Sequence, residues 1–154
     1  MSDTSSAGLT EFVSVVTATF PSATVLTPLN DEVYNWRDRV DEGKFSMPLC
    51  VVVPHAEEPW EDGPATVNQR IMPVDFYYVR SSQLQSGESG QASTYVRAAL
   101  STMREALMAH TPVAMAVWPF PEIDSSHETS LNDDLRQKPE PYISGKLSSR
   151  LLVG

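Results

Sequence analysis

The stretch that decides the fold is Ile143-Ser144-Gly145-Lys146-Leu147-Ser148-Ser149-Arg150-Leu151-Leu152-Val153-Gly154. Its apolar side chains fall on one face of an extended strand, namely Ile143, Leu147, Leu151 and Val153. The opposite face takes Ser144, Lys146, Ser148 and Arg150. Because successive side chains of a strand point to opposite faces, this alternation predicts a half-buried β-strand. We expect that strand to complete a sheet, either in the chain's own fold or in that of a neighbour.

Four earlier segments also favour strands. Residues 49–53 form an almost continuous apolar run that is typical of a buried strand, and residues 23–26 and 113–117 are shorter candidates. In residues 70–80 we expect one face to carry Ile71, Val74, Phe76 and Tyr78, and the other to carry Asp75 and Tyr77. Pro73 has no backbone N–H to donate, so it implies an edge position or a bulge there.

Two segments have the spacing of amphipathic helices. The first covers residues 9–20 and carries Leu9, Phe12, Val13, Val16 and Phe20, with Thr10 as its cap or in its first turn. The second aligns Val96, Leu100, Met103 and Leu107, is capped by Ser93 or Thr94, and ends at Thr111-Pro112. Residues 33–40 fit two turns of helix as well as an irregular arm, and the polar residues 81–93 predict a flexible loop.

The order of these segments predicts an α+β fold, in which a mostly antiparallel β-sheet has two main α-helices packed on one face. The chain has 154 residues, which fits one domain over residues 1–154, since roughly 100–200 residues per domain is usual. Its 12 prolines favour long loops or arms, which we place at about 27–48, 54–70 and 119–141.

The charge balance is acidic, with 11 Lys and Arg against 20 Asp and Glu and a formal net charge of -9. Such a surface repels phosphate, so we do not expect free binding to nucleic acid. It suits solubility, or a surface that DNA passes without adhering. No signal peptide follows Met1, and no segment has the ~20 apolar residues that span a bilayer. We therefore expect no membrane contact and synthesis in the cytoplasm.

The residues give no pattern for catalysis. The single cysteine, Cys50, lies in an apolar run and is expected to be a small buried hydrophobe. His55, His110 and His127 lie far apart, without the tight ligand spacing of a zinc site, and His110 follows a helix whose dipole it would complement. No serine has a nucleophile-elbow context and no glycine-rich segment has a P-loop context. We expect no catalytic residue, no cofactor and no metal ligand.

Aromatic residues lie in or beside the expected loops. Such residues anchor protein interfaces, but they also pack loops onto their own sheet, and the sequence leaves both readings open. Our candidate interface residues are Trp36, Arg37, Arg39, Trp60, Trp118 and Phe120. Segments 27–48 and 54–70 would then be arms that cross to neighbouring subunits, with Trp36 and Trp60 as anchors.

The pattern of elements resembles that of tail terminator (tail completion) proteins of tailed bacteriophages. The resemblance rests on a helix at Leu9–Phe20, a strand at Arg70–Arg80, a polar loop, a helix containing Tyr95-Val96-Arg97-Ala98-Ala99-Leu100, and a strand at Tyr142–Val153. It implies a hexameric ring in the virion that caps the tail tube, ends tube polymerisation and offers a docking surface to the head and neck. The implied partners are the tail tube protein, with the sheath and neck or connector proteins as further candidates, and DNA passing through the lumen without specific binding.

Alternatives remain open at this point. Other neck or head–tail joining proteins of phages would give a similar pattern. A small enzyme with a site built from loops is a second alternative, and it would need His55, His127 and a carboxylate to converge in one pocket. A small-molecule or peptide-binding module with an apolar pocket is the third.

Overall fold

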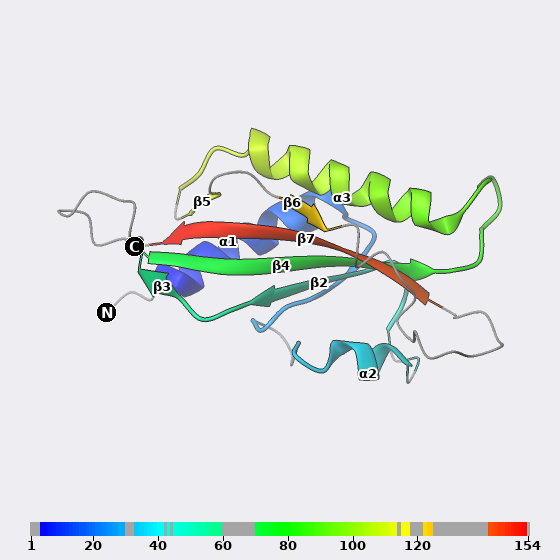
Figure 1. Cartoon of the computed structure of the whole chain (residues 1–154), viewed down its shortest axis with the longest axis horizontal. Helices are drawn as coiled ribbons and strands as arrows, with labels where there is room; N and C mark the ends of the chain where they lie inside the picture. Colours follow the sequence, from blue (N-terminus) through cyan, green and yellow to red (C-terminus); the bar gives the residue numbers. More distant parts are fainter. Residues whose placement is uncertain are drawn as a thin grey trace.

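The computed structural model describes residues 4–29, 33–41, 43, 45–59, 70–113, 115–117, 122–124 and 142–153 (Figure 1). Three helices occur in this part of the chain: α1 (Thr4–Thr19), α2 (Trp36–Asp41) and α3 (Ala92–Ala109). The strands are β1 (Thr24–Leu26), β2 (Leu49–Pro54), β3 (Glu58–Pro59), β4 (Arg70–Ser81), β5 (Ala116–Val117), β6 (Glu122–Asp124) and β7 (Tyr142–Val153). No helix among these residues is both long enough and apolar enough to cross a membrane.

The strands form one sheet in the order β1-β2-β4-β7-β5, and β3 and β6 add to the outer sides of β4 and β7. Among the described strands, β1 and β2 run parallel and the other pairs are antiparallel. The long strands β4 and β7 pair over their whole length, from Arg70 opposite Val153 to Ser81 opposite Tyr142. The predicted α+β class is therefore confirmed, and the closing strand completes the chain's own sheet from a position next to its centre.

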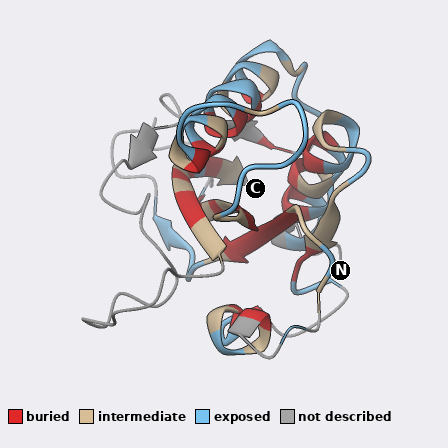
Figure 2. Cartoon of the chain, turned by 90° about the vertical axis from the view of Figure 1, so that its right-hand side faces the viewer, coloured by how far each residue is buried: buried red, intermediate tan, exposed pale blue. Residues whose placement is uncertain are grey.

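Helices α1 and α3 pack together on one face of the sheet (Figure 2). Beneath them lies the larger core, in which Phe12, Phe76, Leu100 and Leu147 have no exposed surface. Phe20, just after α1, stacks on the Phe76 ring with centroids 5.8 Å apart. The predicted stripe of Val96, Leu100, Met103 and Leu107 is buried as expected.

Helix α2 lies on the opposite face of the sheet, which the arm hypothesis for residues 27–48 did not anticipate (Figures 1 and 2). Val33, Trp36 and Val40 are buried there in a second core cluster with Leu49 and Val51. Trp36 and Val40 lie on one side of α2, whereas Val33 precedes the helix and its carbonyl accepts the Trp36 N–H at 3.2 Å, so the helical reading of residues 33–40 is right only from Trp36 onward. The described part of this segment packs on the chain's own sheet. Residues 60–69, 118–121 and 125–141, which include most of the other expected arms, lie outside the described residues.

The helix starts were predicted too late. Helix α1 already runs from Thr4, and the Thr10 hydroxyl donates to the Ser6 carbonyl at 2.8 Å within it, so Thr10 is no cap. The N-cap of α3 is Gln91, without a side-chain capping bond, and Ser93 and Thr94 lie inside the first turn. A threonine hydroxyl can bond to a carbonyl one turn back as well as cap a helix, so the residue type alone does not mark the start.

Strand β4 corrects one side-chain assignment and explains Pro73. Because its pairing with β7 is unbroken, strict alternation places Met72 with Phe76 under the helices and Ile71 on the opposite face. Residues 55–57 separate β2 from β3 opposite Pro73, whose carbonyl accepts the His55 N–H at 2.8 Å. Strand β4 is not an edge strand, because β2 and β3 pair with one side of it and β7 with the other. Of the two alternatives for Pro73, the bulge is therefore right. The strand predicted at 113–117 is only Ala116–Val117, and Val113 is 90% exposed.

Candidate functional site

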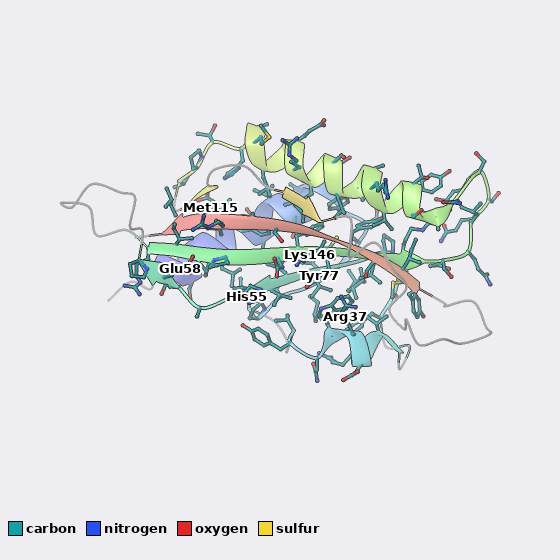
Figure 3. The ribbon with its side chains drawn as sticks, viewed as in Figure 1. Arg37, His55, Glu58, Tyr77, Met115 and Lys146 are labelled. Atoms are coloured by element: carbon teal, nitrogen blue, oxygen red, sulfur yellow. The ribbon has the colours of Figure 1, made fainter. Side chains whose placement is uncertain are left out.

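The candidate site lies on the sheet face that carries α2, starting at Tyr77, whose ring packs on Trp36 of that helix, and extending past the helix. We call this area the open face, and it consists of Pro73, Asp75, Tyr77, Lys146, Ser148 and Arg150. Antiparallel register places Tyr77 opposite Lys146 and Asp75 opposite Ser148. Figure 3 shows Tyr77 and Lys146 near His55, with Arg37 approaching from α2. All six side chains are partly or fully exposed.

Asp75 is the centre of a polar cluster on the open face. Its carboxylate is 2.7 Å from His55 Nε2 and accepts the Ser148 hydroxyl at 3.0 Å. In a Ser-His-Asp triad the histidine must lie between the other two, so that it can take the proton from serine. Here the carboxylate occupies the middle, and the cluster joins β4, β7 and the bulge after β2. This arrangement stabilises the sheet but does not activate Ser148.

A cleft of about 400 Å³ separates α2 from the sheet beside this cluster. Its walls are formed by Val33, Tyr34, Asn35, Trp36, Arg37, Asp38, Val53, His55 and Tyr77. The Arg37 guanidinium lies 4.9 Å from the centroid of the Trp36 ring and 5.7 Å from that of Tyr77. The two rings contact each other as well, with centroids 4.9 Å apart. The cleft therefore has apolar and aromatic walls and a cation fixed on them.

Burial is the main cause that raises the pKa of Tyr77, and the nearby Asp75 carboxylate raises it further, while Lys146 and Arg37 oppose the shift. The phenol consequently stays protonated at neutral pH and can donate a hydrogen bond. It is not a base for proton abstraction.

Cys50 lies in the main core and is fully buried, as its apolar run predicted. Burial raises the pKa of its thiol to about 12, so almost no thiolate forms at neutral pH. A nucleophilic cysteine needs the opposite shift. Cys50 therefore acts as a packing residue.

The other candidate residues from the sequence either lie away from the cleft or fall outside the described residues. His110 is the C-cap residue of α3 and its Nε2 is 2.7 Å from the Glu11 carboxylate of α1, so it links the two helices. Within the described residues no group of three metal-binding side chains occurs. His127, Trp60, Trp118 and Phe120 lie outside that part of the chain.

Trp36 fits the local-packing reading. Its side chain is 4% exposed in the single chain, so it has little area left to give to a neighbour. The neighbouring arginines remain at the surface, with Arg37 on the cleft and Arg39 over the Phe45 ring at 5.0 Å. Sequence reasoning did not single out Asp75, Tyr77 and Ser148 as a group. Alternation placed each on the polar face of its strand, but only the register of β4 with β7 brings them together.

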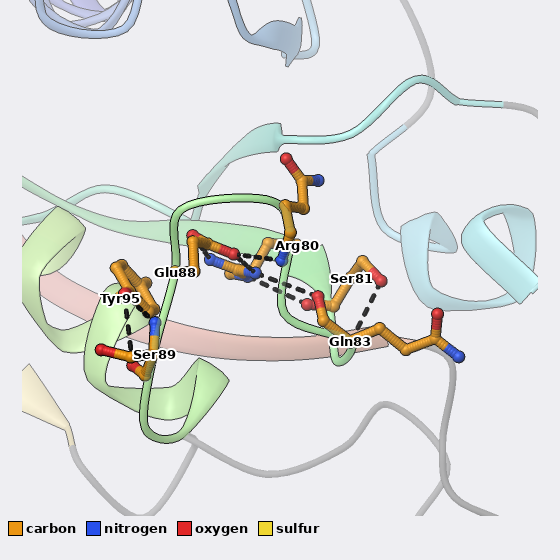
Figure 4. Close-up of polar contacts among 7 residues, drawn as sticks. Arg80, Ser81, Gln83, Glu88, Ser89 and Tyr95 are labelled. Carbon is orange, nitrogen blue, oxygen red and sulfur yellow. Dashed lines mark hydrogen bonds and ion pairs between the residues drawn. The ribbon is translucent and has the colours of Figure 1, made fainter.

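A second polar cluster fixes the loop between β4 and α3 (Figure 4). The Arg80 guanidinium donates to both oxygens of Glu88 at 2.6 Å and lies 5.1 Å from the centroid of the Tyr95 ring. The Arg80 bonds, followed by the bond from the Gln85 N–H, lower the pKa of Glu88 to about 2. Tyr95 also bonds the Ser89 backbone. The loop that composition predicted to be flexible is thus tied to the strand and to the helix that flank it.

In comparisons with known proteins, neither a protein-family model nor a curated protein matched the chain.

Proposed function

We propose that this chain is a structural subunit of a phage virion, a tail terminator that assembles into a ring on the end of the tail tube. The observation that supports it best is the two-sided sheet. One face is sealed by α1 and α3, whereas the other presents the open face and its cleft. A subunit of an assembly needs a surface that its own helices leave uncovered, because neighbouring subunits bind there.

The chemistry of the described residues favours an assembly role over catalysis. The cysteine is buried and protonated, the carboxylate of Asp75 lies between serine and histidine, and Tyr77 is held as a neutral donor. These arrangements join elements of the fold. One base, His55, does line the cleft, but its Nε2 lies 2.7 Å from the Asp75 carboxylate, and the Ser148 hydroxyl bonds to that carboxylate instead of to the histidine.

The charge of the chain supports a path for DNA. A net charge of -9 disfavours adhesion of phosphate, and a closed ring of such subunits would let a duplex slide through its centre. Other neck proteins could share this charge. The charge therefore favours a virion protein that surrounds DNA, and the choice of a tail terminator rests on the resemblance described above.

Negative-stain electron microscopy of the purified chain tests the proposal. We expect particles with a central hole and six-fold symmetry in class averages. Added to polymerising tail tubes, the same preparation should shorten them by capping. A field of small particles without holes, at concentrations where structural rings assemble, would contradict it.

A further inference from the structure

We propose that the cleft between α2 and the sheet is the contact through which one copy of this chain holds an acidic side chain of the next copy. The inference rests on the proposed ring and adds to it the surface, the partner and the residue that carries the contact, Arg37.

Arg37 is positioned for such a contact. Its guanidinium is fixed above the Trp36 and Tyr77 rings, and Trp36 is itself buried in the second core cluster. Arg37 forms a hydrogen bond with the Tyr77 side chain, and within the described residues it forms no ion pair with a carboxylate. A guanidinium has five N–H donors, so the bond to Tyr77 leaves others for a carboxylate, and the stacked side chain has little entropy left to lose.

The nearest acidic groups do not supply that carboxylate. Asp75 is already bonded to His55 and Ser148, and Asp38 lies on the cleft wall as an exposed side chain without an ion pair to Arg37 in the described part of the chain. The phenol of Tyr77 adds a neutral donor on the same wall. Two donor groups and apolar walls in about 400 Å³ fit one carboxylate side chain together with its aliphatic stem.

The charge of the chain favours a second copy as the occupant. The chain carries 20 acidic residues against 11 basic ones, so a neighbouring copy offers mostly acidic surface to any cation that faces it. A cleft on one subunit that takes a different surface of the next is a heterologous contact, the kind that closes into a ring. Arginine and aromatic side chains are also enriched in the residues that carry binding energy at interfaces. Tyr34 at the rim is 66% exposed and would be covered there.

The test is the assembly of Arg37 variants, measured by light scattering over a range of protein concentrations. Arg37→Glu reverses the charge and should weaken assembly by at least about tenfold in dissociation constant, as loss of a central interface residue does. Arg37→Lys keeps the charge but loses the planar fork, so it should lie between Arg37→Glu and the parent chain. Arg97→Glu makes the same charge reversal on exposed α3 and should assemble normally.

The outcomes separate this inference from the proposed function. If the parent chain and Arg37→Glu form equally stable rings, the cleft contact is wrong while the ring proposal stands. If the parent chain is a monomer at every concentration, both are wrong. Circular dichroism checks that the variants are folded. Should Arg37→Glu fail to fold, Arg37→Gln replaces it, and an unchanged ring with that variant contradicts the inference equally.

Discussion

Glu88 illustrates how a single residue can order a loop. Its carboxylate bonds both terminal nitrogens of Arg80, and these bonds hold its pKa at about 2, well below the usual 4.5. A carboxyl whose pKa is lower in the folded state stabilises the fold above its unfolded pKa. That contribution is lost as the pH falls from about 4.5 toward about 2.

We therefore expect Glu88→Gln to have a lower free energy of unfolding than the parent chain at pH 7. The gap should narrow as the pH falls below 4.5 and Glu88 becomes protonated in the unfolded state. Urea denaturation at pH 7 and at pH 3 measures both. Glu105→Gln, an exposed substitution on α3, is the control and should leave the free energy of unfolding at pH 7 within about 0.5 kcal/mol of that of the parent chain. An equal gap at the two pH values would argue against the ion pair.

Cys50 provides a second test at this scale. Its thiol is fully buried with a pKa raised to about 12, so a thiol-specific reagent at pH 8 should label the native chain only as fast as the chain unfolds. The labelling rate should rise with urea in parallel with unfolding. Rapid, urea-independent labelling would show that Cys50 is accessible.

The sequence was sufficient for residues whose environment is local. The apolar neighbours of Cys50 alone predict that its side chain is buried, and the structure confirms this burial. The bonds of Arg80 to Glu88 across a loop were not predicted, because they depend on turns at Gly87 and Gly90, whose φ angles are 88° and 85°. Only glycine adopts such angles readily, but the sequence does not show where the chain then goes.

Among the elements, the contact of α1 and α3 with the sheet is the main source of buried apolar area. Phe76 lies in its centre with no exposed surface and stacks on Phe20. Phe76→Ala should lower the free energy of unfolding by about 3–5 kcal/mol, which is usual for a large buried aromatic side chain. Urea denaturation measures it against Val113→Ala, a 90% exposed position where the change should stay within about 0.5 kcal/mol. A small effect of Phe76→Ala would contradict this core.

The pairing of His110 with Glu11 links the two helices of that layer. Glu11 also accepts the Val113 N–H at 3.1 Å, so its carboxylate holds the C-terminal end of α3 in two ways. A double-mutant cycle with His110→Ala and Glu11→Gln should give a coupling energy of about 1 kcal/mol, since both side chains are mostly buried. A coupling energy near zero would mean that the contact contributes nothing in solution.

The helices and strands with regular hydrophobic spacing could be predicted from the sequence, whereas the connections between them could not. Strands β2, β4 and β7 and the buried stripe of α3 follow from hydrophobic spacing. The interruption of the β2 and β3 pairing at residues 55–57, opposite Pro73, and the packing of α2 on the second face of the sheet depend on contacts between distant segments. The secondary-structure propensity of a segment carries no information on such contacts. For this reason the sequence predicts an arm at residues 27–48, where the structure has a helix packed on the sheet.

At the scale of the whole molecule, the two faces of the sheet differ in how far helices cover them. One face is covered by two helices, and the other presents the open face and the Arg37 cleft. We propose that this second face, on a chain with net charge -9, is a contact surface between subunits.

Native mass spectrometry of the purified chain tests this claim most directly, because it counts the subunits in each assembled species. We expect a dominant species with six times the mass of one chain, and we expect the Arg37→Glu substitution in the cleft to dissociate it. A monomer across all protein concentrations would contradict the central claim that this chain is built to assemble.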